Sequence, residues 1–176
     1  MDKFFIIANR QKDKELKTAR KVEAYLNSKG KSCILREETS EQKARSNHYT
    51  DVEKIPKDVE CIIVIGGDGT LLQAARDVVN RQIPLLGINM GTLGYLAEID
   101  RSSIDGALNH LMLDEYTIEK RMMLNGKVYH KEELIAEDVA LNDIVIGRDG
   151  PLHVTRFHNY VNGEFLNSYT ADGIII

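Results

Sequence analysis

The first third of the chain alternates short apolar runs with stretches of helical period. Lys3 to Ala8 has the length and composition of a strand, and residues 14–29 then place apolar side chains every three or four positions. Gly30 ends this helix, and residues 32–36 form a second apolar run. A strand, helix and strand of these lengths predict a right-handed crossover between two parallel strands.

The same pattern returns after a polar interval. Residues 37–58 hold only two isolated large aliphatic residues and predict a mobile, solvated loop. Residues 61–65 predict a buried strand, and residues 83–88 predict another. The helix between them is expected to turn inward the apolar side chains of Leu71, Leu72, Ala75, Val78 and Val79. A last helix, capped by Ser102 or Ser103, completes a doubly wound α/β domain.

Beyond about residue 115 the pattern becomes that of antiparallel strands. Asn125-Gly126 predicts a tight hairpin turn between residues 116–124 and 127–129, because Asn-Gly readily adopts two positive φ angles. Asn162-Gly163 predicts a second hairpin. The sequence closes on three consecutive isoleucines, which we interpret as a strand cut short.

We therefore expect two domains. Residues 1–115 form an α/β nucleotide-binding domain with a parallel, doubly wound sheet. Residues 116–176 form the first part of an antiparallel β-rich domain that is incomplete in this chain.

Composition narrows the classes of partner. The 176 residues have a net charge of -4 with both signs interspersed, which argues against nucleic acid or an anionic membrane as a partner. Cys33 and Cys61 each open an apolar run, so we expect buried thiols in a reducing compartment. No apolar run approaches the length of a membrane span, and we expect a cytoplasmic protein.

The residues Gly66-Gly67-Asp68-Gly69-Thr70 join a buried strand to a helix. Glycines at such a strand end allow backbone N–H groups to approach a phosphate. A carboxylate repels phosphate, so Asp68 indicates chemistry or a metal rather than simple anchoring. The alternative is that these residues form only a tight turn.

Three further segments carry candidate polar residues. Gly91 to Leu96 is a second glycine-rich loop after a predicted strand, although its spacing alone is a weak signal. Asn142-Asp143 interrupts an apolar run, and Asp172-Gly173 precedes another; each pair could equally be a simple turn. The five histidines show no paired metal-ligand spacing, so no metal ligand is assigned.

In order and spacing, the turn at residues 66–70, the loop at 91–96, Leu141-Asn142-Asp143 and Ala171-Asp172-Gly173 resemble the motifs of the NAD kinase family. Diacylglycerol and sphingosine kinases, and more loosely 6-phosphofructokinases, share a turn of the first type but lack the other three motifs. The resemblance covers residues 3–176.

The resemblance implies phosphoryl transfer from ATP or polyphosphate to the 2′-hydroxyl of the adenosine ribose of NAD, with a divalent metal such as Mg²⁺. It also implies a homodimer or homotetramer, with the site between an α/β domain and a β-rich domain. Asp68 would be the proton acceptor. The implied nucleotide-binding residues are Gly67, Asp68, Gly69, Tyr95, Asn142, Asp143, His153, Thr170 and Asp172.

The chain departs from the family pattern at three places. Gln73 stands where many relatives have a basic residue, and Asp143 stands where many have glutamate. The sequence also stops before a threonine- and serine-rich segment that contacts both nucleotides in the family. A nucleotide-binding module without catalysis therefore stays open as an alternative, and a lipid kinase is a more distant one.

Overall fold

The structure is a computed structural model that describes residues 1–35, 50–91, 94–148, 150 and 154–176. These residues form two compact units, Met1–Lys120 and Arg121–Ile176. The predicted position His153 lies outside the described residues, as do Thr92 and Leu93 of the second glycine loop. Each unit is described by itself.

The first unit is built on a four-stranded parallel sheet with strand order β2-β1-β3-β4. Its elements along the chain are β1 (Lys3–Ala8), η1 (Lys14–Leu16), α1 (Lys17–Ser28), β2 (Ser32–Leu35), η3 (Val52–Lys54), β3 (Cys61–Gly66), α2 (Asp68–Asp77), η4 (Val79–Arg81), β4 (Leu85–Asn89) and α3 (Ile104–Met112). The predicted α/β class and parallel sheet are confirmed.

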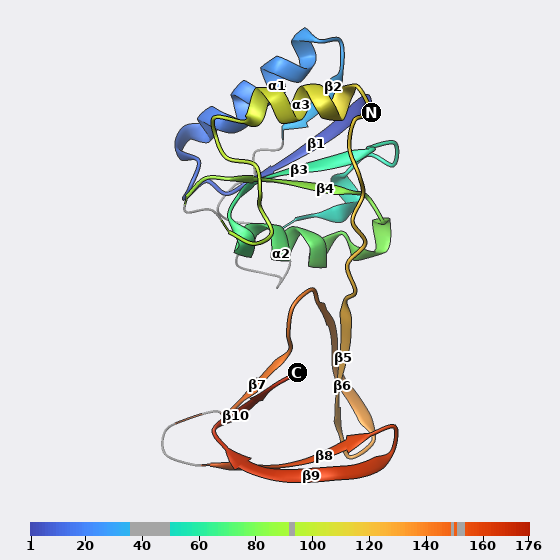
Figure 1. Ribbon diagram of the computed structural model, residues 1–176. Coiled ribbons are helices and arrows are strands. Elements are labelled where there is room, and N and C mark those ends of the chain that lie inside the picture. The colour runs from blue at the N-terminus through green and yellow to red at the C-terminus, as the bar shows by residue number, and fades with distance from the viewer. Residues whose placement is uncertain (36–49, 92–93, 149, 151–153) are drawn as a thin grey trace. The chain divides into compact units, whose positions relative to one another are not determined.

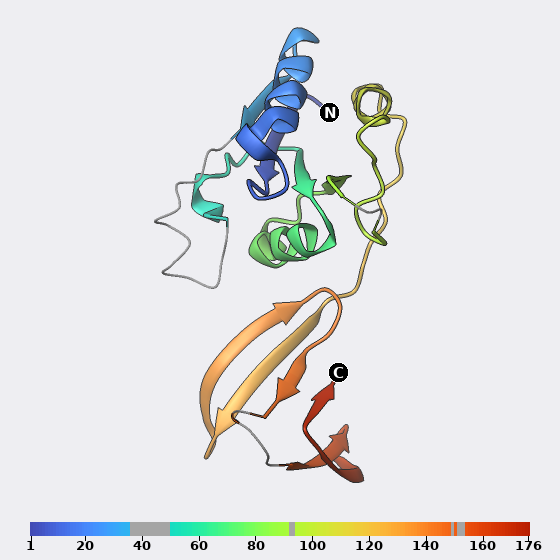
Figure 2. The same cartoon turned by 90° about the vertical axis from the view of Figure 1, so that its left-hand side faces the viewer.

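Two apolar clusters cover the two faces of this sheet. Helices α1 and α3 lie on one face, and α2 lies on the other (Figures 1 and 2). Strand β3 contributes to both clusters, because Ile63 and Ile65 pack toward α1 and α3 whereas Ile62 and Val64 pack toward α2. This explains its unbroken apolar run, which is typical of a strand buried on both sides.

Three expectations for the first unit need correction, and the first concerns the inner face of α2. The buried face of α2 and its C-terminus is formed by Leu71, Ala74, Asp77 and Val78, whereas Leu72, Ala75 and Val79 are only half-buried. A polar residue therefore takes part in the inner face. The buried Asp77 carboxylate accepts hydrogen bonds from the Thr50 N–H (2.8 Å) and the Gln73 side chain (2.9 Å), which satisfies it there.

The described part of the predicted loop is also more ordered than its composition indicates. Ile55 is only 2% exposed and belongs to the cluster under α2. The Arg81 guanidinium donates hydrogen bonds to the carbonyls of Val52, Ile55 and Pro56, which fixes this segment. The prediction of a solvated loop is therefore wrong at the buried residues Thr50 and Ile55, whereas Asp51, Glu53, Lys54, Lys57 and Asp58 are exposed.

The start of α3 differs from the prediction as well. Ser103 is the residue before the helix, but its side chain makes no capping hydrogen bond. Instead, the Ser102 and Ser103 hydroxyls donate to the Asp100 carboxylate at 2.6 and 3.2 Å. The Asp100 carboxylate also accepts both serine N–H groups, so a local turn precedes the helix.

The two cysteines are buried and unpaired with each other, as predicted. Both lie in the cluster under α1 and α3. Desolvation by burial raises the pKa of each thiol to about 12, so both are protonated at neutral pH. These thiols act as small apolar core residues.

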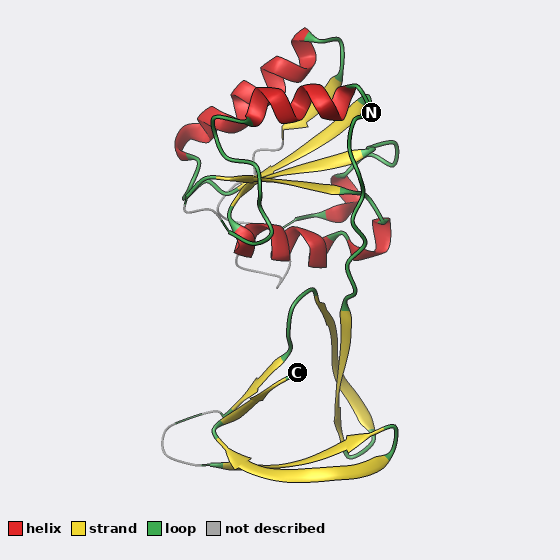
Figure 3. Ribbon diagram, viewed as in Figure 1, coloured by secondary structure: helices red, strands yellow, loops and turns green. Residues whose placement is uncertain are grey.

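The second unit contains three two-stranded antiparallel ribbons and, among its described residues, no helix (Figure 3). The ribbons are β5 (Leu124–His130) with β6 (Glu133–Ala140), β7 (Val145–Gly147) with β10 (Gly173–Ile175), and β8 (Thr155–Val161) with β9 (Glu164–Ala171). The predicted antiparallel β character is confirmed, and two of the three terminal isoleucines, Ile174 and Ile175, lie in a strand.

One of the two predicted hairpin turns is correct. Asn162-Gly163 connects β8 and β9 with φ angles of 52° and 86°. Asn125-Gly126 instead lies inside β5, where it pairs with Val139 and Asp138. The turn falls at Lys131-Glu132, with φ angles of 46° and 70°. A turn at residue 125 would leave only a short second strand, whereas the observed turn allows β5 and β6 to pair along their whole length.

The described residues of the second unit include no fully buried side chain. Apolar residues are exposed on all three ribbons, and they include Tyr129, Ile135, Val145, Tyr160, Phe165, Leu166, Tyr169 and Ile175. Two-stranded ribbons of this kind are at best marginally stable without cover. This unit thus has the strands of an antiparallel β domain without a core of its own.

Candidate functional site

The strand order of the first unit determines where a ligand site is expected. From β1 the chain first moves outward to β2, and it then returns past β1 to β3 and β4. The strand order reverses between β1 and β3, and ligands of open α/β sheets bind outside the carboxyl ends of the strands at such a point. Two segments meet there: residues 9–13 after β1 and residues 67–70 after β3.

The glycine-rich turn after β3 leads directly into helix α2. Gly67 is extended, and its carbonyl accepts the N–H groups of Thr70 (2.9 Å) and Leu71 (3.1 Å). Among the described residues, no acceptor is found for the N–H groups of Asp68 and Gly69. Donors in the first turn of a helix have no partner inside the helix, so these two groups are available to an anion.

Residues after β1 fix this turn from the neighbouring strand. The Asn9 N–H donates to the Ile65 carbonyl (2.8 Å), and the Asn9 side-chain amide donates to the Thr70 hydroxyl (3.2 Å). The same hydroxyl accepts the Gly67 N–H at 3.5 Å. The two strand ends therefore form one hydrogen-bonded unit.

The Asp68 carboxylate is held by three backbone donors from the segment after β4. Its Oδ2 accepts the Tyr95 N–H at 2.8 Å, and its Oδ1 accepts those of Leu96 (3.2 Å) and Ala97 (3.0 Å). A Cβ at Gly94 would overlap the carboxylate, so only glycine allows this approach. The half-buried carboxylate thus has one fixed orientation.

These contacts also keep Asp68 ionised. The Ala97 N–H, then the Tyr95 and Leu96 N–H groups, hold the pKa of Asp68 below its ordinary value, and the positive charge of Lys12 acts in the same direction. The carboxylate is therefore negatively charged throughout the neutral range. Its three donors leave capacity for about one more hydrogen bond, because a carboxylate has about four lone-pair sites.

One of the three residues that hold this carboxylate carries an exposed aromatic ring. Tyr95 is 93% exposed, although its backbone N–H is fixed on Asp68. A large apolar ring held in water by a fixed backbone can stack on a planar ligand. The segment after β4 therefore meets the glycine-rich turn after β3 at Asp68.

The candidate residues of the second unit lie on two different bends. Asn142 and Asp143 are exposed between β6 and β7, and Asp172 is exposed between β9 and β10. The Arg148 N–H donates to the Asp172 carbonyl at 3.0 Å, whereas Ile144 pairs with Ile176 at the other end of the same ribbon.

These bends are therefore at opposite ends of the β7–β10 ribbon. The two ends are five residue steps apart along the chain, from Asp143 before β7 to Arg148 after it, or about 17 Å at strand spacing. Thr170 is exposed on β9 opposite Arg156, near the Asp172 end. The second unit by itself does not gather its four described candidates into one cluster.

Two residues of the first-unit site were not found from the sequence. Asn9 and Lys12 lie in the polar segment after β1, and no motif marks them. The one available signal was their position after a parallel strand that neighbours the glycine turn.

Comparison with known proteins decides the family. The model of the ATP-NAD kinase N-terminal domain matches residues 4–116. The chain belongs to the NAD kinase family. Over its whole length it is 47% identical to an NAD kinase of Lachnospira eligens and 46% identical to one of Agathobacter rectalis. It spans about 60% of the length of each of these relatives.

Solved structures with this fold include other members of the family. Yeast NADH kinase complexed with NADH superposes with a TM-score of 0.79 at 23% identity, over 99% of this chain and 57% of the yeast chain. An NAD kinase from Archaeoglobus fulgidus in complex with ATP gives a TM-score of 0.68 at 18% identity, over 98% of this chain and 59% of its own. At these identities the similarity establishes the fold alone.

The structure also bears on membranes and metals. No helix in the described ranges is both long and apolar enough to cross a membrane. Among the same residues, no three His, Cys, Asp or Glu side chains are grouped so that they could hold a metal ion. In this family member the described part of the site is thus made of backbone donors and single charged side chains.

Proposed function

We propose that this protein transfers the terminal phosphoryl group of ATP, or of inorganic polyphosphate, to the 2′-hydroxyl of the adenosine ribose of NAD, giving NADP. Membership in the NAD kinase family supports the reaction class. The single observation on which the proposal depends is the Asp68 carboxylate, ionised and fixed by three N–H groups beside the free donors of the α2 N-terminus.

In the proposed step, Asp68 accepts a hydrogen bond from the ribose hydroxyl. The hydroxyl oxygen forms a bond to the terminal phosphorus while the bond from that phosphorus to the bridging oxygen breaks. The electron pair of the broken bond leaves with ADP or with the shortened polyphosphate, and the hydroxyl proton passes to Asp68.

The low pKa of Asp68 is compatible with this role. A carboxylate held below its ordinary pKa is a weak base. Phosphoryl transfer passes through a loose transition state in which the attacking oxygen has formed little bond, so it needs orientation more than deprotonation. Orientation is what the three fixed hydrogen bonds supply.

The NAD-binding roles are proposed for both units. Gly67 and Gly69 would act through their backbones, and the exposed Tyr95 ring would stack on a planar group of the nucleotide. Exposed polar residues of the second unit would bind ribose hydroxyls and the base, namely Asn142, Asp143, Thr170 and Asp172. We add His153 from the family pattern; it lies outside the described residues.

A divalent cation such as Mg²⁺ is compatible with the described residues if it is bound mainly by the phosphates of the donor. Mg²⁺ keeps several waters and is commonly bound through one or two carboxylates together with substrate phosphates. The described residues offer single carboxylates rather than a cluster, so the cation would arrive with the donor phosphates. When bound it would neutralise charge on the transferring group.

We also propose a homodimer or homotetramer in the cytoplasm. The uncovered apolar side chains of the second unit support association, since patches of this kind mark interaction surfaces. The two free cysteines support a reducing compartment.

The test is direct. The full-length protein and the 176-residue chain are each incubated with NAD, Mg²⁺ and either ATP or polyphosphate, and NADP is measured with a dehydrogenase specific for it. We expect NADP from the full-length protein. If neither donor gives NADP, the proposed function is wrong.

For the 176-residue chain alone, a second candidate is nucleotide binding without transfer. The observation that favours it is the absence of buried side chains among the described residues of the second unit. Strands without a core would not hold Asn142 and Asp143 firmly enough for in-line transfer. Binding of NAD by calorimetry without NADP formation would support this candidate.

A further inference from the structure

Lys12 lies directly against the glycine-rich turn, and no motif assigns it a role. A Cβ built at Gly67 would overlap the Lys12 ammonium nitrogen, and the Lys12 Cε lies 3.7 Å from that Cβ position. The close approach is possible because residue 67 has no side chain. The cation is thus held over the turn between β3 and α2.

The backbone of Lys12 is fixed on both sides. Its N–H donates to the backbone carbonyl (3.0 Å) and the side-chain oxygen (3.3 Å) of Asn9. On the other side, the buried Asp13 carboxylate accepts the N–H groups of Thr18 (3.0 Å) and Ala19 (2.9 Å) at the start of α1. Only the flexible stem of Lys12 is therefore left to move.

The charge of Lys12 is not neutralised by an ion pair within the described part of the chain. No described carboxylate oxygen lies within 4.0 Å of its ammonium group. The Asp13 carboxylate is occupied by the α1 donors, and Asp68 interacts with Lys12 only over a longer range. An ammonium group of this kind has three donors to offer to a ligand.

We propose that Lys12 binds the phosphate chain of the phosphoryl donor, together with the N–H groups of Asp68 and Gly69 at the start of α2. This inference rests on the proposed function. Asp68 orients the acceptor hydroxyl, and the transferred phosphorus must lie within about 3–3.5 Å of that oxygen. The phosphate next to this turn is thus the donor's terminal group rather than the pyrophosphate of NAD.

The chemistry of this contact does not require a nucleoside. An ammonium group and two backbone donors recognise phosphate oxygens, and ATP and inorganic polyphosphate present the same oxygens. Lys12 should therefore act equally on both donors. An equal effect on ATP and polyphosphate distinguishes a contact to phosphate from a contact to the base or ribose, which only ATP contains.

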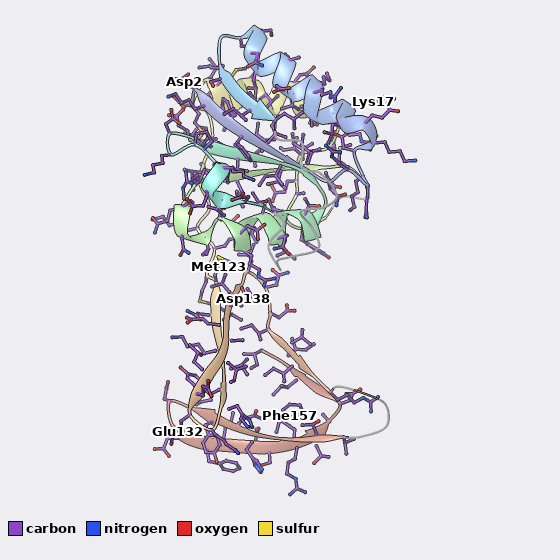
Figure 4. All side chains as sticks on the ribbon, turned by 180° about the vertical axis from the view of Figure 1, so that it is seen from behind. Asp2, Lys17, Met123, Glu132, Asp138 and Phe157 are labelled. Carbon is purple, nitrogen blue, oxygen red and sulfur yellow. The ribbon has the colours of Figure 1, made fainter. Side chains whose placement is uncertain are left out.

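The experiment compares three variants of the full-length protein. Lys12→Gln removes the charge, Lys12→Arg keeps it, and Lys17→Gln removes a similar charge from the exposed face of α1, where Lys17 pairs with Glu15 at 3.2 Å (Figure 4). For each variant, the KM for ATP, polyphosphate and NAD is measured at fixed salt, together with kcat. Circular dichroism confirms the fold.

We expect Lys12→Gln to raise the KM for both donors by about 10- to 100-fold, the range for a charge-assisted hydrogen bond. The KM for NAD should change by less than about twofold. Lys12→Arg should recover most of the loss, and Lys17→Gln should match the wild type. Unchanged donor KM values would overturn the proposal, as would a rise confined to NAD or to ATP.

A second variant tests the contact itself. In Gly67→Ala the new methyl group would overlap the ammonium group, which must move away, while the extended backbone tolerates alanine. If Lys12 acts as proposed, Gly67→Ala raises the donor KM in the wild type and adds little in the Lys12→Gln background. Full additivity of the two effects would contradict the proposal.

A binding measurement tests the role of Lys12 independently of NADP formation. Inorganic tripolyphosphate is titrated by calorimetry into the wild type and into Lys12→Gln. A loss of affinity of about 10-fold or more supports the role of Lys12 even if no NADP is formed, in which case only the proposed function fails. Equal affinities would remove Lys12 from the phosphate site.

Discussion

The two units of this chain solve the problem of burial differently. In the first, the parallel strands β1, β3 and β4 are each followed by a helix that packs on the sheet, so β3 is covered on one face by α1 and α3 and on the other by α2. In the second, strands pair with antiparallel partners two at a time, and the described residues include no buried side chain. A crossover helix packs on a face of the sheet and buries it, whereas a hairpin only adds another strand at the edge and leaves both faces exposed.

This difference extends to the candidate chemistry. Asp68 is held by three hydrogen bonds to a neighbouring segment that is itself bonded to β4, since the Asn89 N–H donates to the Ile99 carbonyl at 2.7 Å. Asn142 and Asp172 lie on exposed bends. The first unit therefore presents a preorganised group, and the second presents groups whose positions depend on what covers its ribbons.

The largest expected effect tests the difference in burial. Phe4 is 1% exposed in the core of the first unit, and Phe165 is 57% exposed in the second, where it contacts the edge of Tyr160. In the 176-residue chain, Phe4→Ala should lower the free energy of unfolding by about 3–5 kcal/mol, because it leaves a cavity in the core. Phe165→Ala should cost less than about 1.5 kcal/mol, the upper value for an aromatic pair.

The measurement is urea unfolding followed by the circular dichroism signal of helix. All described helices belong to the first unit, so this signal reports on it alone (Figure 3). Phe165→Ala should leave the midpoint unchanged. If it lowers the midpoint as much as Phe4→Ala does, the two units unfold together and the comparison is invalid.

Most of the first unit could be predicted because its signals are local. The apolar run of β3 and the spacing of Ala19, Val22 and Leu26 on α1 indicated these elements and their buried faces. Burial of Ile55 and Asp77 could not be predicted, because it depends on Arg81 and Thr50, which are distant in sequence. Composition alone does not contain such contacts.

The second expected effect concerns the division of roles between the units. In the full-length protein, Asp68→Asn should lower kcat by at least about 100-fold with little change in NAD affinity, because an amide cannot accept the proton. The amide also places an NH₂ group against one of the three N–H donors, so a fold control by circular dichroism is needed. A loss below about tenfold would exclude Asp68 as the proton acceptor.

Asn142→Ala is the matching change in the second unit. It should weaken NAD binding by about 10-fold through lost hydrogen bonds, with a smaller effect on kcat at saturating NAD. Calorimetry with NAD measures the first quantity, and steady-state kinetics the second. Unchanged affinity would remove Asn142 from the proposed site.

The candidate site was only partly accessible from the sequence. The glycine turn and its carboxylate stand out because the turn follows a buried strand directly. The three donors that hold Asp68, and the approach of Lys12 over Gly67, arise from segments after two other strands. Strand order brings these segments together, and strand order is a property of the fold rather than of any motif.

The misplaced hairpin gives the smallest expected effect and the most local test. Glu132 adopts a φ of 70° in the turn between β5 and β6, whereas the neighbouring Glu133 opens β6 (Figure 4). Because side chains disfavour positive φ, Glu132→Gly should stabilise the full-length protein by about 0.5–1 kcal/mol. Glu133→Gly, a matched change one residue later, should destabilise it, since glycine weakens a strand. Thermal unfolding of both variants decides the matter. If Glu132→Gly destabilises the protein as much as Glu133→Gly does, strand pairing does not force residue 132 into a strained turn. The hairpin turn would then be expected at Asn125-Gly126, as the sequence predicted.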